Sequence, residues 1–175
     1  MVLEIEPRNW YREGYLVSTE LKLLDADAVQ AAMASDLMWW TKSLPREVVV
    51  KMLQNSLCFG LYELPKSTSE IAGKGSLKQI GLVRVVTDDV TFAYLTDVYV
   101  LEEYQHKGLG RWMMECLDEV IKSWPHLRRF ALLTSSSQEL YKKTLGAKDW
   151  EELKKPGLLM QMVVGPGGVA DGPKQ

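Results

Sequence analysis

The sequence predicts a mixed α/β domain in which helices pack on a mostly antiparallel sheet. A hairpin is indicated by two apolar runs, residues 79–87 and 91–101, which a short turn at Asp88-Asp89 joins. The second run, a long helix and another apolar run at residues 129–134 follow one another. That order predicts a mixed sheet with helices packed on it. The helix shows the three- and four-residue spacing of one buried face: Leu109, Trp112, Met113, Cys116, Leu117, Val120, Ile121 and Trp124.

Shorter patterns predict the remaining elements. Asp25 precedes an alanine-rich run and suits an N-cap, which predicts a helix over residues 25–34. Pro45 favours the first turn of a second helix. A short helix is expected over residues 137–145, where Gly146 closes it. Strands are expected over residues 15–18 and 57–63, and a final hairpin over residues 149–153 and 158–164.

Three further segments are expected to be irregular. Residues 1–13 have a mixed pattern and are interpreted as a loosely docked lead-in. Residues 64–78 are rich in turn-forming residues and predict a long, mobile hairpin loop. Residues 165–175, rich in glycine and proline, predict a disordered C-terminal tail. The 175-residue chain therefore suits a single domain, placed at residues 1–164.

Composition limits the classes of partner. The formal net charge of −2 and the pI near 5.8 disfavour nucleic acid, which usually requires a basic face. Cys58 and Cys116 each lie in an apolar stretch without metal-ligand spacing, so we expect reduced core thiols and no metal. No apolar run approaches the roughly 20 residues that span a bilayer, and no signal-peptide pattern is seen. These observations predict a cytoplasmic protein without a membrane partner.

Residues 98–111 carry the strongest functional pattern. An apolar run ends in a glycine-containing turn that opens the long helix, and such a helix start leaves backbone N–H groups free for an anion. Gly108 and Gly110 lack a Cβ atom, so a phosphate can approach the main chain. His106, Lys107 and Arg111 add side-chain donors. The spacing fits neither a Walker P-loop nor a dinucleotide fingerprint, and a helix that merely begins with glycine stays open.

Residues 105–110, Gln-His-Lys-Gly-Leu-Gly, resemble the Q/R-x-x-G-x-G/A signature of the GNAT superfamily of N-acetyltransferases. The resemblance covers roughly residues 15–164, and further matching blocks lie at residues 44–47, 56–62, 84–88 and 91–98. It implies a central sheet that splays between its fourth and fifth strands to admit acetyl-CoA. It also implies a set of residues for that cofactor: Val98, Val100, Gln105, His106, Lys107, Gly108, Leu109, Gly110, Arg111 and Ser137.

The resemblance also implies roles for residues near the thioester. The carbonyl would be polarised by a backbone N–H of the fourth strand, near Val100 or Leu101. Tyr141 matches the position of a tyrosine that protonates the leaving thiolate, and a phenol stays protonated at neutral pH. The alternative for Tyr141 is an amphipathic ring with a wet hydroxyl. Asp97 is the candidate general base, with a solvated acid or an ionic partner for the acceptor as alternatives.

The acceptor side is expected around three aromatic residues. Tyr99 alternates with Asp97 along the strand, so both are expected on one face, while Val98 and Val100 point elsewhere. Trp39 and Trp40 are candidates for an aromatic acceptor pocket, since a tryptophan face attracts ammonium groups, and core packing is the alternative. The chain reads Ser-Ser-Ser-Gln at residues 135–138, where related chains usually carry an Asp and a His. The hydroxyls of Ser136 or Ser137 could instead cap the following helix.

These features together predict an acetyl-CoA-dependent N-acetyltransferase acting on a primary amine of a small molecule or of an exposed protein or peptide. The alternative is a non-catalytic acyl-CoA-binding or interaction module on the same fold. A homodimer is left open as the assembly.

Overall fold

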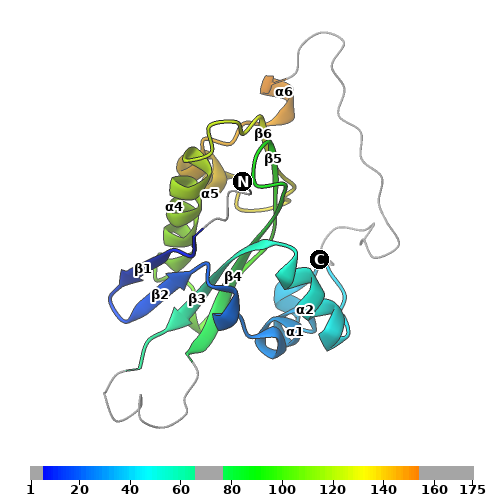
Figure 1. The fold of residues 1–175 in the computed structure, drawn as a ribbon, viewed down its shortest axis with the longest axis vertical. Coiled ribbons are helices and arrows are strands. Elements are labelled where there is room, and N and C mark those ends of the chain that lie inside the picture. The colour runs from blue at the N-terminus through cyan, green and yellow to red at the C-terminus, as the bar shows by residue number, and fades with distance from the viewer. Residues whose placement is uncertain (1–5, 66–76, 154–175) are drawn as a thin grey trace.

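The computed structural model describes residues 6–65 and 77–153 and shows one six-stranded sheet with helices on both faces (Figure 1). The strands follow one another across the sheet in chain order, and every neighbouring pair is antiparallel except the parallel pair β5–β6. This confirms the predicted mixed, mostly antiparallel sheet. The strands are β1 (Asn9–Arg12), β2 (Tyr15–Ser18), β3 (Leu57–Glu63), β4 (Lys78–Thr87), β5 (Phe92–Val100) and β6 (Arg129–Leu132).

The predicted helices and strands are confirmed to within two residues at each end, apart from two segments discussed below. Asp25 caps its helix as expected, since its carboxylate accepts the N–H groups of Asp27 and Ala28. The helices are α1 (Ala26–Met33), α2 (Arg46–Gln54), α4 (Leu109–Lys122), α5 (Gln138–Leu145) and α6 (Trp150–Leu153), with 3-10 turns η1 (Leu21–Leu23), η2 (Asp36–Met38) and η3 (Glu102–Tyr104).

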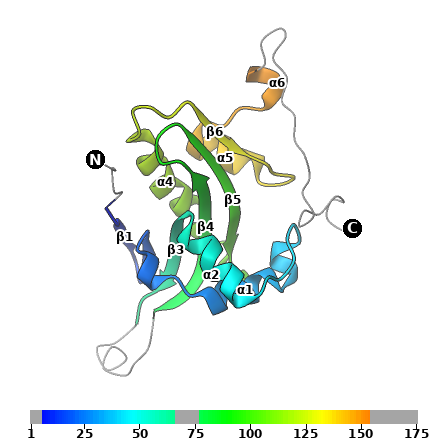
Figure 2. The same ribbon diagram turned by 45° about the vertical axis from the view of Figure 1, so that its right-hand side comes forward.

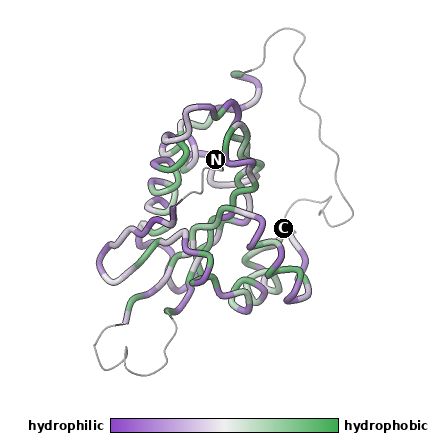
Figure 3. Tube along the Cα trace, in the orientation of Figure 1, coloured by the Kyte–Doolittle hydropathy of each residue, from purple (hydrophilic) through white to green (hydrophobic). Residues whose placement is uncertain are grey.

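Two apolar clusters divide the core between the faces of the sheet. Figure 1 shows α4 on one side of the strands and α1 and α2 on the other, and Figure 3 shows apolar residues along both the strands and the helices. One cluster joins the buried stripe of α4 to inward residues of β3, β4 and β5. The other lies under α1 and α2 and includes Cys58, Leu82 and Tyr99. Cys58 and Cys116 are both buried free thiols, as predicted. The sheet is therefore covered on both faces, which places the site at its edges and strand ends.

Two predictions of secondary structure were wrong. Residues 9–12 form β1 and are not a loose lead-in, because Trp10 donates its indole N–H to Glu119 Oε2 at 3.0 Å and stacks on Phe59. Residues 150–153 form the helix α6 and not a strand, because the Glu152 carboxylate reaches back and accepts the Asp149 backbone N–H at the start of the helix. The second strand expected at 158–164, the tail and most of the 64–78 loop lie outside the described residues.

A β-bulge in β5 sets which side chains reach each face. The register passes from Leu82 opposite Tyr99 to Arg84 opposite Thr96, so β5 contains one extra residue. Asp97 has a left-handed backbone with a φ of 47° at this point. The extra residue switches the alternation along β5, so residues on both sides of the bulge pack into the α4-side cluster: Ala93, Leu95, Val98 and Val100.

Strands β5 and β6 separate after a short pairing. Phe92 to Leu95 pair with Arg129 to Leu132, and no later pair joins the two strands in the described part of the chain. Within residues 6–65 and 77–153, the C-terminal half of β5 therefore has no strand partner on that side, which is called its open edge. This is the splay expected between the fourth and fifth strands of the family, which are β5 and β6 here because β1 adds a strand.

The β4–β5 turn gives a prediction about stability and pH. The Asp88 carboxylate accepts backbone N–H groups of Val90, Thr91 and Phe92, which holds its pKa well below the ordinary value. A lowered folded-state pKa stabilises the fold above the unfolded-state pKa near 4, and this stabilisation is lost as the pH falls further. We expect Asp88→Asn to lower the melting temperature by a few degrees at pH 7.

The difference between wild type and Asp88→Asn should stay constant down to about pH 5 and shrink below about pH 4. Thermal unfolding followed by circular dichroism between these values measures it. Asp89→Asn, at the neighbouring left-handed residue, is the matched comparison, because burial and the nearby Asp88 charge raise the pKa of the Asp89 carboxyl. Removing that charge should leave the variant at least as stable as the wild type at pH 7, so its difference from wild type has the opposite sign. An Asp88→Asn difference that is the same at pH 3 as at pH 7 would contradict the Asp88 assignment.

Candidate functional site

The start of α4 is a turn with unusual backbone geometry. His106 and Gly108 both have left-handed backbones, with φ values of 62° and 74°, and Gly108 is the N-cap of α4. No side chain caps the helix, so its first N–H groups have no side-chain acceptor. Buried Leu109 anchors the first turn in the core. The turn therefore presents main-chain donors and the positive end of the helix dipole to solvent.

The two glycines leave room in front of these donors. A Cβ atom added at Gly108 or at Gly110 would meet no atom within 4 Å. Gly108 needs glycine for its backbone conformation, since its φ is positive. The backbone conformation of Gly110 does not require glycine, and no protein atom would contact a side chain at this position. A small residue is therefore explained by a ligand that lies close to the main chain.

Side chains around the turn either tie it to β5 or place positive charge on the surface beside it. Gln105 donates its Nε2–H to the Val100 carbonyl at 2.9 Å, which ties the turn to the end of β5. Lys107 places its ammonium 4.8 Å from the centre of the Tyr104 ring. Arg111 is exposed and pairs with Glu115 one turn later at 2.9 Å. His106, Lys107 and Arg111 are all on the surface beside the turn.

The open edge of β5 leads into this turn. The Leu101 N–H donates to the Ile80 carbonyl at 2.8 Å, so these two residues are a hydrogen-bonded pair of the ladder. Because such pairs alternate in an antiparallel ladder, the N–H groups of Val100 and Val98 point away from β4. They face the side that β6 leaves open. Either Val100 or Leu101 was expected to offer the N–H that polarises the thioester carbonyl. The Leu101 N–H already bonds β4, so it cannot serve as that donor, and Val100 remains.

Helix α5 supplies Ser137 and Tyr141. Tyr141 is half-buried against the α4-side cluster, and burial raises the pKa of its hydroxyl. Ser137 is exposed with a φ of 60° and its side chain makes no cap hydrogen bond. The predicted capping role of Ser136 or Ser137 is therefore wrong, because Ser137 occupies the cap position in a left-handed conformation and no side chain accepts the first N–H groups of α5.

Asp97 is buried in a hydrogen-bond network on the opposite face of β5. Its Oδ2 accepts Arg84 Nε at 2.7 Å, and its Oδ1 accepts Trp40 Nε1 at 3.2 Å. Arg84 also donates Nη1–H to Ser56 Oγ at 3.0 Å. Both oxygens of Asp97 are thus engaged, and a proton on either would leave the buried Arg84 charge without its counter-ion.

Arg84 was not among the site residues predicted from the sequence. The signal was available, because Arg84 and Asp97 are isolated opposite charges inside the two apolar runs of one hairpin. Their pairing follows once the two strands are adjacent.

The aromatic residues of the acceptor side lie close to Asp97. The rings of Trp39 and Trp40 meet edge to face, with centroids 5.9 Å apart. Trp39 is 38% exposed, whereas Trp40 is half-buried against the α1–α2 cluster. Tyr99 is buried in that same cluster, and burial raises its pKa. The structure therefore brings Asp97, Tyr99 and Trp40 to one face of β5, and places Val98 and Val100 on the other.

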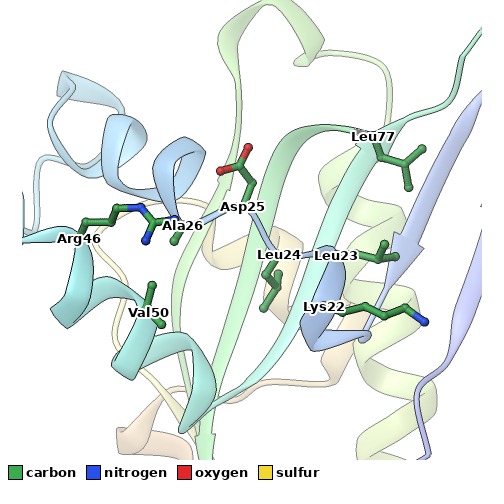
Figure 4. A pocket seen from close by; sticks show the side chains of 8 residues that line it. All are labelled: Lys22, Leu23, Leu24, Asp25, Ala26, Arg46, Val50 and Leu77. Atoms are coloured by element: carbon green, nitrogen blue, oxygen red, sulfur yellow. The ribbon is translucent and has the colours of Figure 1, made fainter. Parts of the chain in front are cut away.

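A separate hollow of about 380 Å³ lies beside η1 and the beginnings of α1 and α2 (Figure 4). None of its lining residues belongs to the predicted cofactor or acceptor set. Its two cationic side chains are paired, Arg46 with Asp27 and Lys22 with Glu20, and the Asp25 carboxylate caps α1. The hollow is lined by Lys22, Leu23, Leu24, Asp25, Ala26, Arg46, Val50 and Leu77.

Two further properties concern residues 6–65 and 77–153. Within these ranges no three His, Cys, Asp or Glu side chains gather closely enough to hold a metal ion. Within the same ranges no helix combines the length and apolar character needed to cross a bilayer.

Comparisons with known proteins agree with this geometry. The model of the acetyltransferase (GNAT) family matches residues 28–147. A Gibberella zeae protein, FG08082, is 47% identical over 95% of this chain and 98% of its own length. Its name describes it as an inferred acetyltransferase.

Solved structures share the fold. A GNAT-family structure from Xanthomonas campestris pv. campestris has a TM-score of 0.62 and 29% identity, over 85% of this chain and 93% of that one. A Clostridium acetobutylicum structure solved with acetyl-CoA has a TM-score of 0.52 over 81% of this chain and 93% of that one, and at 14% identity it supports the fold alone. With a family model that spans residues 28–147 and a relative 47% identical along nearly its whole length, this chain belongs to the GNAT family of acetyltransferases.

Proposed function

We propose that this protein transfers the acetyl group of acetyl-CoA to a primary amine, carried by a small molecule or exposed on a protein or peptide. One observation carries the proposal: the open edge of β5 runs directly into the uncapped glycine turn of α4. A strand edge with free N–H groups suits the amide-rich pantetheine arm, and a helix start suits its diphosphate.

The proposed binding mode assigns a role to each part of this path. Backbone N–H groups around Gly108 and Gly110 hold the diphosphate, and Lys107 and Arg111 add positive charge beside it. The N–H groups of Val98 and Val100 hold the pantetheine arm in an extended line along β5. When bound, acetyl-CoA supplies an activated thioester. The Val100 N–H is the proposed donor to its carbonyl oxygen, where negative charge develops as the amine attacks.

Tyr141 is the proposed general acid for the departing thiolate. Its half-buried place in α5 raises the pKa of its hydroxyl, which keeps the proton on the oxygen throughout the neutral range. The structure leaves that hydroxyl without a hydrogen-bond partner among the described residues. Ser137, exposed at the start of the same helix, is a further proposed contact for the pantetheine arm.

One observation favours the second candidate, a non-catalytic acyl-CoA-binding module. Asp97, the candidate base in β5, has both carboxylate oxygens engaged and offers no free oxygen to an amine. A transferase of this design depends on amine that is already deprotonated when it binds, and its rate should rise with pH until Tyr141 itself ionises. A module would bind coenzyme A and release no thiol with any amine.

The glycine turn is tested by changing Gly110 to residues that differ in charge. Gly110→Glu should leave the melting temperature unchanged or slightly higher, because the side chain meets open space and a carboxylate is favourable at a helix start. It should weaken coenzyme A binding at least about a hundredfold, roughly 2.7 kcal/mol, because the carboxylate repels the diphosphate.

Isothermal calorimetry with coenzyme A measures this affinity. Gly110→Ala is the matched small variant and should lose much less, since the signature admits alanine at this position. Lys122→Ala, at the far end of α4, controls for charge changes on the helix. Equal affinities for Gly110→Glu and Gly110→Ala would show that the turn does not hold the diphosphate.

The acid role is tested by Tyr141→Phe. We expect kcat to fall about a hundredfold while the KM for acetyl-CoA changes little, because only the proton donor is lost. Thiol release over a panel of amines at pH 6 to 11 should show a rate that falls at high pH in the wild type, and this alkaline limb should be absent from the variant. Tyr11→Phe, at an exposed tyrosine of β1, is the control. An unchanged pH profile in Tyr141→Phe would remove the acid assignment.

A further inference from the structure

We infer that Arg84 and Asp97 are positioning residues that hold Trp40 at the bulge of β5, so that Trp39 and Trp40 form a wall for the apolar part of the acceptor amine. This inference rests on the proposed function and names the substrate class of the same site. It replaces the expectation that Asp97 is a general base. This tryptophan wall consists of Trp39 and Trp40.

The network joins four separate segments of the chain. Asp97 in β5 bonds Arg84 in β4 at 2.7 Å and the Trp40 indole N–H, after η2, at 3.2 Å. Arg84 in turn bonds Ser56 Oγ, and Ser56 donates to the Met52 carbonyl in α2. Each member is thus held from two sides, and the Trp40 ring is fixed relative to both β5 and the end of α2.

Burying the Arg84–Asp97 ion pair carries a desolvation cost, and packing alone does not require it. The side chains of Arg84 and Asp97 are only 14% and 6% exposed. Removing two charges from water costs several kcal/mol per ion, and apolar residues of similar volume often stabilise a core equally well. A buried ion pair is better explained by geometric specificity, and here the geometry that it fixes is that of Trp40.

The tryptophan wall lies beside the open edge of β5. Asp97 directly precedes Val98, whose N–H is one of the proposed contacts for the pantetheine arm. The anchored Trp40 supports Trp39 edge to face, and Trp39 keeps 38% of its surface exposed. Trp40 packs on the face of β5 that α1 and α2 cover, and Figure 2 shows these two helices beside the strands. On this inference the wall stands next to the position where the thioester would lie.

The charge balance selects the kind of amine. Arg84 neutralises Asp97, so this network offers aromatic faces and no unpaired carboxylate to a substrate. Rings of this kind bind apolar groups and attract a single ammonium weakly. A primary amine that carries an apolar group fits the wall, and a second ammonium would find no counter-ion in the network. We therefore expect phenethylamine to be a better acceptor than putrescine.

Kinetics on phenethylamine test the anchor. Trp40→Phe keeps a ring and the ion pair but loses the N–H to Asp97, and it should raise the KM for phenethylamine about tenfold with less than about a twofold change in the KM for acetyl-CoA. Trp150→Phe in α6 is the control. A Trp40→Phe variant whose amine KM matches that of the control would overturn the proposal.

Two substitutions at Asp97 separate positioning from base catalysis. Asp97→Asn leaves one acceptor oxygen for the two donors, Arg84 Nε–H and Trp40 Nε1–H, so it should raise the amine KM by no more than Trp40→Phe does, with the acid side of the pH profile retained. Asp97→Leu removes the acceptor and should behave as Trp40→Phe does. An equal collapse of kcat in both variants, with loss of the acid limb, would identify Asp97 as the base. Melting temperatures identify any variant that fails to fold, and Trp40→Phe then decides, since it leaves the ion pair intact.

A binding measurement makes the inference independent of turnover. The six indole N–H signals of ¹⁵N-labelled protein are assigned by single Trp→Phe variants, and phenethylamine is added in the presence of coenzyme A. Shifts concentrated at Trp39 and Trp40 support the wall even if no thiol is released with any amine, an outcome that would remove only the proposed function. Turnover of phenethylamine without shifts at these two signals would retain the function and overturn the wall.

Discussion

The separation of β5 from β6 after Leu95 is the constraint on which the rest of the structure depends. Up to Leu95 the two strands share a parallel ladder, and beyond it the N–H groups of Val98 and Val100 face a side without a strand in the described part of the chain. Unpaired main-chain donors are costly when buried and are normally satisfied by some partner. In this protein the donors are arranged in a line that ends at the glycine turn of α4, so an extended ligand with amide and phosphate groups satisfies them in order.

The bulge at Asp97 lets one strand serve two purposes. Without the extra residue, Val98 and Val100 would turn from the α4-side cluster to the opposite face, and the core beneath α4 would lose two apolar contacts. With it, the valines stay in the core and Asp97 faces Arg84 and Trp40. The same irregularity that preserves the packing therefore brings a charged network to the border between the cofactor edge and the acceptor face.

Patterns among neighbouring residues were sufficient to predict most of the helices and strands and the glycine turn. The stripe of α4, the Asp25 cap and the Asp88 turn are encoded within a few neighbouring residues, so the sequence alone predicted them. Strand β1 was missed because its stability comes from Trp10 reaching Glu119 and Phe59, far along the chain. Helix α6 was misread because Trp150 and Leu153 suit a strand equally well, and only the Glu152 contact favours the helix.

The candidate site could be predicted only in part for the same reason. Gly108 and Gly110 form a local motif, but the state of Asp97 depends on a partner in another strand and on a register that the bulge shifts. Similarly, only the ladder distinguishes the engaged Leu101 N–H from the outward Val100 N–H. Long-range pairing therefore determines which of the sequence candidates remain chemically free.

Backbone hydrogen exchange with and without coenzyme A tests the central claim most directly. The account predicts that coenzyme A slows exchange at the amides of residues 108–111 and at Val98 and Val100, with no comparable change along β1 or at the hollow beside η1. Protection confined to other segments, or no protection at saturating coenzyme A, would contradict the account.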